Sequence, residues 1–443
     1  MLEQKDIILK SRLEAFVKKD GDYWSFRGKA VREHAHAYFQ YPAMMVPQMQ
    51  SELIGIIKDI SPGIKRILDP FVGSGTTMTE AMLQNLDFTG QDINPLSYLL
   101  CRVKSGPFFL PSIVKKAQKV VGKINRLRSK KIEVEFAGMN KWFQHNIAIE
   151  LSHIKRAILE EDSKWARRFF WITLAETVRL TSNCRTSTYK LHIRPRQEVE
   201  SRGISAKDIF NKILFRNIDR LSKIHDMLDE RKLLNRGHYK GEINICIGDT
   251  SNTIKNAHTS DLLITSPPYG DNNTTVPYGQ HSYLPLQWIP PCDIISNLDG
   301  TYLNTTHEID RRSLGGSRKN AVSKSQYLND KSYTFQKMMN LLENKPSDCQ
   351  SRLAAFCVDL DASLELIINA LKPDSYMIWI LGNRRIANKT ILVDEIVSDL
   401  LVHKGCIRIT KLQRRIPNKR SASKNKTTST MNSESILVLR KTV

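Results

Sequence analysis

The stretch IKRILDPFVGSGTTMTEAMLQNL, residues 64–86, decides the fold. Its first six residues are typical of a buried strand, GSGTT is typical of a tight turn, and MTEAMLQNL is typical of a helix. Thr77 and Glu80 fit a capping box at the start of that helix. A second strand, DFTGQDI, follows, and Asn94-Pro95 is the N-cap and first residue of another predicted helix. Strand, helix, strand, helix at this spacing predicts a parallel α/β sheet.

The rest of the chain divides into a helical part and a return to the strand pattern. Residues 106–240 show helical periodicity with basic faces and predict about four helices. EINICIGD and DLLITSPPY predict two further strands, residues 270–350 a long irregular segment, and SYMIWILGN another strand. CIRITKLQRRIP and SESILVLRK predict a closing hairpin around the polar stretch KRSASKNKTTST. The count of seven strands predicts a doubly wound α/β sheet with an antiparallel hairpin at one edge and a large helical insertion.

Composition narrows the class of partner. The 443 residues carry a net charge of +22, which favours a polyanionic partner such as nucleic acid, although charge alone also fits a merely basic soluble protein. Seven scattered cysteines with no C-x-x-C pair argue against a disulfide framework and a structural zinc site, so no metal is expected. The N-terminus has no apolar signal region and no apolar run is long enough to span a membrane, so we expect a cytoplasmic protein.

Three strand ends predict one ligand cleft. The turn from Asp69 to Thr77 is rich in glycine and precedes a helix, so the backbone can approach a ligand closely and the free N–H groups of the helix start can bind it. The turn is not a nucleotide P-loop, because no G-K-[ST] sequence follows it. Asp92 ends the second strand, where a carboxylate can accept both hydroxyls of a ribose, and Asp249 ends the third. Each is ordinary alone, yet together they outline a cleft shaped for adenosine.

Thr265-Ser266-Pro267-Pro268-Tyr269 predicts the chemistry. The two prolines end the fourth strand and leave carbonyl oxygens fixed and unpaired, which alone could be a stiff turn. Next to the glycine-rich turn, the Ser266 hydroxyl and Pro267 carbonyl can accept the N–H groups of an exocyclic amine and localise its lone pair. The Tyr269 ring offers a flat face to a base flipped out of a duplex.

At these three motifs the sequence resembles the amino-methyltransferase family of site-specific DNA methyltransferases. DPFVGSGTT resembles the family's cofactor motif, QDINP its acidic ribose motif, and TSPPY its catalytic motif, whose serine form usually accompanies N4-cytosine. The resemblance implies a class I methyltransferase (Rossmann-like) sheet, S-adenosyl-L-methionine as cofactor, double-stranded DNA as substrate, base flipping, and a possible cognate restriction endonuclease. The resemblance covers residues 34–104 and 243–443. The cofactor motif precedes the catalytic motif here, whereas most N4-cytosine enzymes have the opposite order. The resemblance therefore does not locate the target-recognition region.

The resemblance also assigns residues to sites. Tyr41 and Pro42 match the segment that packs over the methionine end of the cofactor. The catalytic residues are then Ser266, Pro267, Pro268 and Tyr269, and the cofactor-binding residues are Tyr41, Pro42, Asp69, Pro70, Phe71, Gly73, Ser74, Gly75, Thr76, Asp92, Ile93, Asn94, Asp249 and Thr250. Candidate DNA contacts, each also explicable as a solvated surface charge, are Arg185, Arg311, Arg312, Arg414 and Arg415.

The expected organisation has three parts. Residues 1–105 form an N-terminal segment and the cofactor-binding half, residues 106–240 a helical insertion that could read DNA, and residues 241–443 the catalytic half with a DNA-contacting segment at 270–350. Three alternatives stay open: an N6-adenine DNA methyltransferase, an RNA base methyltransferase with a similar D-P-F-x-G-x-G turn, and a non-catalytic DNA-binding subunit that retains the fold.

Overall fold

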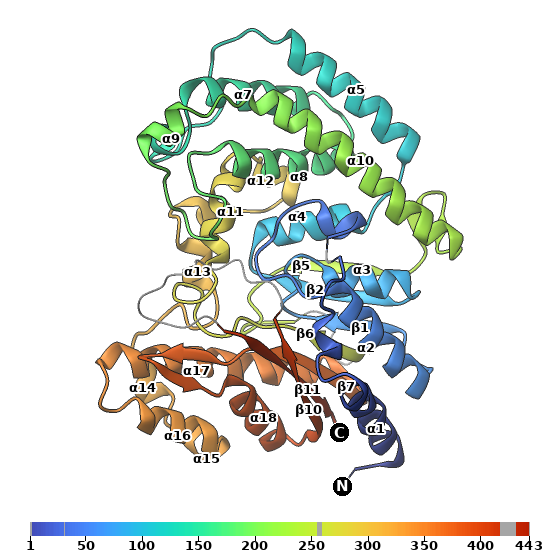
Figure 1. Cartoon of the computed structure of the whole chain (residues 1–443), viewed down its shortest axis with the longest axis vertical. Helices are drawn as coiled ribbons and strands as arrows, with labels where there is room; N and C mark the ends of the chain where they lie inside the picture. Colours follow the sequence, from blue (N-terminus) through green and yellow to red (C-terminus); the bar gives the residue numbers. More distant parts are fainter. Residues whose placement is uncertain (1, 31, 255–258, 417–430, 443) are drawn as a thin grey trace.

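The computed structural model describes residues 2–30, 32–254, 259–416 and 431–442. Its centre is a seven-stranded sheet in the order β10-β11-β7-β6-β1-β2-β5 (Figure 1). The strands are β1 (Arg66–Asp69), β2 (Asp87–Asp92), β5 (Ile243–Ile247), β6 (Ser260–Thr265), β7 (Leu371–Leu381), β10 (Ile407–Arg415) and β11 (Ser433–Arg440). Strands β5, β2, β1, β6 and β7 run parallel, and β11 and β10 are antiparallel. The predicted doubly wound seven-stranded sheet with a closing hairpin is confirmed.

The two faces of the sheet bury different side chains, because successive residues of a strand point to opposite faces. On β1, Ile67 belongs to the larger hydrophobic core and Leu68 to the smaller one. The larger core is shared with α2 (Pro47–Ile60), α3 (Thr76–Leu83) and α4 (Pro95–Lys104). The smaller core is shared with α16 (Tyr333–Leu341), α17 (Ser347–Asn369) and α18 (Val393–His403).

A layer of helices stands beyond the larger core, at the top of Figure 1. Its four long members are α5 (Leu110–Arg126), α7 (His145–Leu159), α8 (Lys164–Thr181) and α10 (Ala206–Glu230), and α6 (Met139–Trp142) and α9 (Arg196–Glu200) are short. Two short strands, β3 (Leu234–Asn235) and β4 (His238–Tyr239), follow. Helix α8 packs against both α4 and α11 (Tyr278–Gln287), so this layer contacts the sheet domain through α4, on the face that carries the larger core.

Residues 270–350 are more ordered than predicted. They contain α11, α12 (Pro291–Ile294), η3 (Thr301–Leu303), α13 (Glu308–Arg312), α14 (Ala321–Lys324), α15 (Leu328–Lys331) and α16. The prediction of an irregular segment was wrong for most of this stretch. Apart from α11 and α16, these helices have only one or two turns and are too short to show the 3.6-residue period on which the prediction depended. Tertiary packing holds them, since Leu284, Ile309 and Leu328 are all buried.

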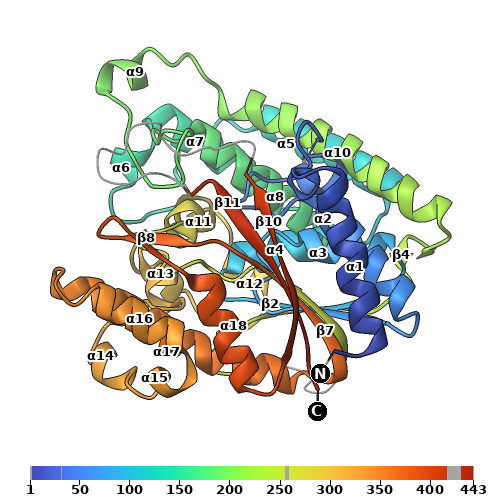
Figure 2. The same ribbon diagram turned by 60° about the horizontal axis from the view of Figure 1, so that its bottom comes forward.

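The remaining elements frame the sheet. They are α1 (Gln4–Lys19), η1 (Tyr23–Ser25), η2 (His34–Ala37), β8 (Arg384–Ile386) and β9 (Lys389–Ile391). Figure 2 shows α1 and α2 beside the long β10–β11 ribbon. No helix in the described residues is long and apolar enough to span a membrane. The predicted polar loop KRSASKNKTTST lies outside the described residues.

Two predicted helix starts have different outcomes. Asn94 caps α4 as predicted, since its side chain accepts a hydrogen bond from the Leu96 N–H and Pro95 opens the helix. The capping box of Thr77 and Glu80 was wrong. Helix α3 begins two residues earlier, at Thr76 after Gly75 in the left-handed conformation, and Glu80 instead contacts His36.

Candidate active site

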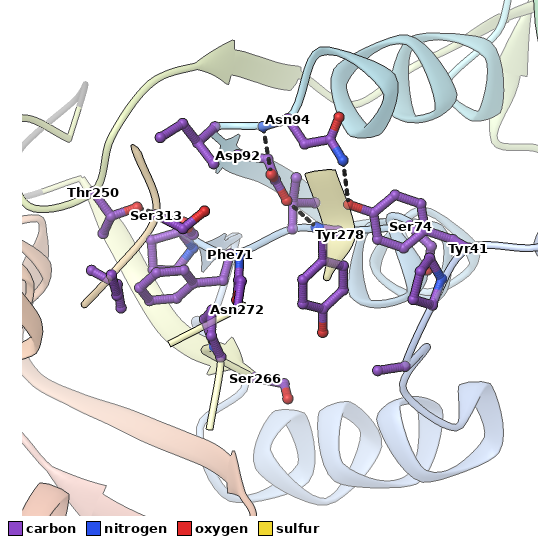
Figure 3. Close-up of a pocket in the computed structure, with 18 of the residues that line it drawn as sticks. Tyr41, Phe71, Ser74, Asp92, Asn94, Thr250, Ser266, Asn272, Tyr278 and Ser313 are labelled. Atoms are coloured by element: carbon purple, nitrogen blue, oxygen red, sulfur yellow. Dashed lines mark hydrogen bonds between the residues drawn. The ribbon is translucent and has the colours of Figure 1, made fainter. Parts of the chain in front are cut away.

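A cavity of about 810 Å³, partly open to solvent, lies at the carboxyl ends of β1, β2, β5 and β6 (Figure 3). The parallel order of these strands brings together ends that are up to 200 residues apart in the chain. The predicted site residues that line it are Tyr41, Pro42, Pro70, Phe71, Gly73, Ser74, Thr76, Asp92, Ile93, Asn94, Asp249, Thr250, Ser266 and Pro268. The segments predicted as cofactor motif and catalytic motif therefore both contribute residues to one cavity.

Two residues of the glycine-rich turn stand behind the cavity wall. Asp69 and Gly75 do not line the cavity. Asp69 is fully buried and accepts hydrogen bonds from the Phe71 N–H at 3.1 Å and the Thr265 hydroxyl at 2.7 Å, which ties the turn to β6. Burial raises the pKa of Asp69 to about 7. Gly75 has φ of +72°, and a Cβ there would lie 2.9 Å from Cys101 Sγ. Both residues shape the turn from behind.

Asp92 holds the turn from the next strand. One carboxylate oxygen accepts the Gly73 N–H at 2.8 Å and the other accepts the Asn94 N–H at 2.9 Å. Burial raises the pKa of Asp92. The Asn94 amide in turn donates to the Tyr41 hydroxyl at 3.2 Å and the Ser282 hydroxyl at 2.7 Å. Asp92 lines the cavity and is partly exposed, so its carboxylate is positioned to accept hydroxyl groups from a ligand there.

Asp249 and Thr250 close the cavity beyond β5. The Thr250 hydroxyl donates to the Pro70 carbonyl at 2.8 Å, which joins the end of β5 to the turn after β1. The Asp249 carboxylate accepts the Ser251 N–H at 2.9 Å. In Figure 3, Phe71 and Thr250 stand on one side of the cavity and Tyr41 on the other.

The catalytic motif forms a hydrogen-bonded chain. Ser266 and Pro268 line the cavity, Pro267 is buried, and Tyr269 is half-buried. Ser266 Oγ lies 3.1 Å from Tyr269 Oη, which donates to Glu434 Oε1 at 3.0 Å. Glu434 is also ion-paired with Arg414, at 2.9 Å. Burial and the neighbouring Glu434 carboxylate hold the pKa of the Tyr269 hydroxyl well above its ordinary value.

Several site residues were missed from the sequence. Glu434 lies about 170 residues after Ser266, and only its pairing opposite Arg414 in the β10–β11 hairpin could have indicated it. The cavity wall itself contains further residues that were missed, most of them on loops and short helices: Ala43, Met44, Met45, Val72, Gly248, Asn272, Tyr278, Ile309, Ser313 and Leu314. Asn272 Oδ1 is buried without a hydrogen-bond partner, so a ligand donor could satisfy it.

The predicted DNA-contacting arginines differ in their surroundings. Arg185 is exposed in the loop after α8, and the Arg415 side chain is 80% exposed. Arg311 and Arg312 both form ion pairs with Glu308 and remain partly open to solvent. The prediction for Arg414 was wrong, because its side chain is only 6% exposed and is paired with Glu434. It cannot meet a phosphate at the surface.

One group of side chains could coordinate a metal. The donor atoms of His34, His36 and Glu80 lie within 4.8 Å of one another. None of the three lines the cavity. The buried Lys104 ammonium interacts electrostatically with Glu80 and both imidazoles and would oppose a cation there, although burial lowers its pKa to about 8.

Comparison of the sequence with known proteins identifies a related protein. No protein-family model matches the chain. The chain is 32% identical over 462 aligned residues to the Type II methyltransferase M.MvaI of Kocuria varians. The alignment covers 99% of this chain and 98% of that relative, so it includes the sheet, the helical layer and the hairpin alike. A match of this length and identity shows that the chain belongs to the Type II methyltransferase family.

Proposed function

We propose that the protein is a site-specific DNA methyltransferase that transfers a methyl group from S-adenosyl-L-methionine to N4 of cytosine in duplex DNA. One observation carries the proposal: Ser266 and Pro268 of the catalytic motif line the same cavity as the glycine-rich turn and Asp92. A methyl donor and a base could therefore meet in one cavity. The relative from Kocuria varians is described as a Type II methyltransferase, which supports a role of this protein in a restriction-modification system with a cognate endonuclease.

The cavity suits an adenosine-containing cofactor. Its wall combines apolar side chains such as Met44 and Ile309 with a few polar groups, as is typical of ligand pockets. The Asp92 carboxylate lines the cavity and can accept ribose hydroxyls, Phe71 and Ile93 offer apolar contact to an adenine ring, and the unpartnered Asn272 Oδ1 can accept an N–H. We assign Tyr41 and Pro42 to its methionine end. When bound, S-adenosyl-L-methionine supplies a methyl group activated by its positively charged sulfur.

The chain's own residues make the amine reactive. The N4 lone pair of cytosine is delocalised into the ring and is a poor nucleophile. The Ser266 hydroxyl and the Pro267 carbonyl accept the two N–H groups and localise that lone pair. Both acceptors are fixed before the reaction, so little reorganisation is needed during it. The target base reaches them only after flipping out of the duplex, and the Tyr269 ring supplies a stacking surface.

The basic surface would hold the duplex. With a net charge of +22, the protein attracts the phosphate backbone, and exposed Arg185, Arg311, Arg312 and Arg415 are the proposed contacts. Phosphate contacts position DNA without reading its sequence. The helical layer of residues 106–240 remains our proposed region for sequence recognition.

The test is sequencing of genomic DNA from cells that express the protein, read for N4-methylcytosine and N6-methyladenine. We expect N4-methylcytosine at one short motif, and none with Ser266→Ala. Ser323→Ala, on the exposed surface of α14, is the matched control and should keep full methylation. N6-methyladenine at the motif would change the assigned base, and unmodified DNA would refute the proposal.

A further inference from the structure

The catalytic motif does not end at its tyrosine. A continuous chain runs from Ser266 at the cavity wall through Tyr269 to Glu434 on β11, with separations of 3.1 Å and 3.0 Å. Resting on the proposed function, we propose that Ser266, Tyr269 and Glu434 form a proton relay that orients Ser266 as an acceptor and removes the proton of the methylated amine. Glu434 is then the terminal proton acceptor of the reaction.

The hydrogen-bond direction of this chain is set at its far end. An ionised carboxylate can only accept, so the Tyr269 hydroxyl must give its hydrogen to Glu434. Tyr269 Oη is then free to accept the hydrogen of the Ser266 hydroxyl. The lone pairs of Ser266 Oγ are left for the target amine. Glu434 thereby decides whether Ser266 presents an acceptor or a donor to the substrate.

Arg414 holds the Glu434 carboxylate in place through an ion pair. The two residues lie directly opposite each other in the β10–β11 ladder, and Arg414 Nε is 2.9 Å from the Glu434 oxygen that Tyr269 does not use. The side chains are 6% and 15% exposed, so solvent screens this ion pair little. The Tyr269 ring is confined as well, since a Cβ on Gly382 would lie 2.5 Å from its Cδ2.

The relay balances the proton released by methylation. The amine nitrogen forms a bond to the methyl carbon while the carbon–sulfur bond breaks and its electron pair stays on sulfur. The nitrogen becomes positively charged and passes a proton to Ser266 Oγ. The serine proton moves to Tyr269 Oη, and the tyrosine proton moves to Glu434 Oε1. The net change is one proton transferred from the amine to the carboxylate, and the tyrosine is neutral before and after.

The decisive variant is Glu434→Gln, which keeps the shape of the side chain and removes its charge. We expect at least a tenfold loss in the single-turnover rate of methyl transfer to a cytosine-containing duplex, with S-adenosyl-L-methionine affinity and Tm nearly unchanged. Tyr269→Phe interrupts the same relay and should cause a similar loss. Because the two residues act in series, the double variant should be no slower than the slower single variant.

The matched control is Glu395→Gln. Glu395 on α18 forms ion pairs with Arg408 and Lys411 of the same β10 strand and does not contact the catalytic motif, so this variant should keep the full rate. A full rate in Glu434→Gln would overturn the relay and leave the proposed function standing. Losses that add in the double variant, together with lower Tm and cofactor affinity, would also overturn it, since they indicate a structural role. Failure of the proposed function is separate, because the unmodified protein would then methylate no cytosine.

Discussion

At the scale of single residues, Asp92 connects the fold to the proposed ligand. It holds the Gly73 and Asn94 N–H groups and is positioned to accept ribose hydroxyls. Asp92→Asn removes the charge and one acceptor while it keeps the side-chain size. We expect S-adenosyl-L-methionine affinity to fall by about 1.5–3 kcal/mol, roughly 10- to 150-fold, measured by calorimetry. Asp87→Asn, at the other end of β2, should leave affinity unchanged, and equal losses in both would argue against the assigned cleft.

At the scale of elements, His281 fixes α11 against the segment that carries Tyr41. Its Nε2 lies 2.9 Å from the Gln40 carbonyl oxygen and donates to it. Burial, with the nearby Arg179 charge, lowers the pKa of His281 to about 3. The unfolded chain then binds more protons than the folded one between about pH 6.5 and pH 3, so this residue lowers stability as pH falls through that window.

The prediction is a difference in pH dependence between the protein and His281→Asn. The variant should be less stable near neutral pH, where it lacks the packing and hydrogen bond of the imidazole. Below pH 6.5 the stability gap should narrow by at most about 1.4 kcal/mol per pH unit, as measured by urea unfolding. His403→Asn, at an exposed position of α18, is the control, and the difference in stability between this variant and the unmodified protein should not change in the same way with pH. A constant gap from pH 7 to pH 4.5 would show that His281 is not held neutral.

At the scale of the whole molecule, the net charge of +22 predicts salt-dependent DNA binding. The logarithm of the association constant for a non-specific duplex should fall linearly with the logarithm of salt concentration. If Arg185 contacts one phosphate, Arg185→Ala should reduce the magnitude of that slope by about 0.9. Fluorescence anisotropy across a salt series measures it. Arg12→Ala, on α1 near the chain termini, is the matched control, and an equal effect of both would mean a diffuse charge effect.

The sequence by itself determined the sheet and the strand ends that meet at the cavity. Each strand of the sheet is a local pattern, and the carboxyl ends of parallel strands must meet at one edge, so Asp92, Asp249 and Ser266 could be placed together from their positions after strands. The same local patterning predicted the Asn94 cap of α4. These features depend on residues close together in the chain.

Other features of the site and of the fold were decided by the tertiary structure alone, because they depend on contacts between segments that are distant in the chain. Asp69 lies behind the cavity wall only because its carboxylate pairs with Thr265 on a neighbouring strand. Most helices of residues 270–350, such as α13, are too short to be recognised by periodicity and are held by packing. Arg414 resembled a surface charge in the sequence, yet the register of β10 against β11 buries it opposite Glu434 and places that carboxylate behind Tyr269. A one-residue slip of β10 against β11 would turn Arg414 to the other face of the sheet, away from Glu434, and only the folded hairpin determines this register.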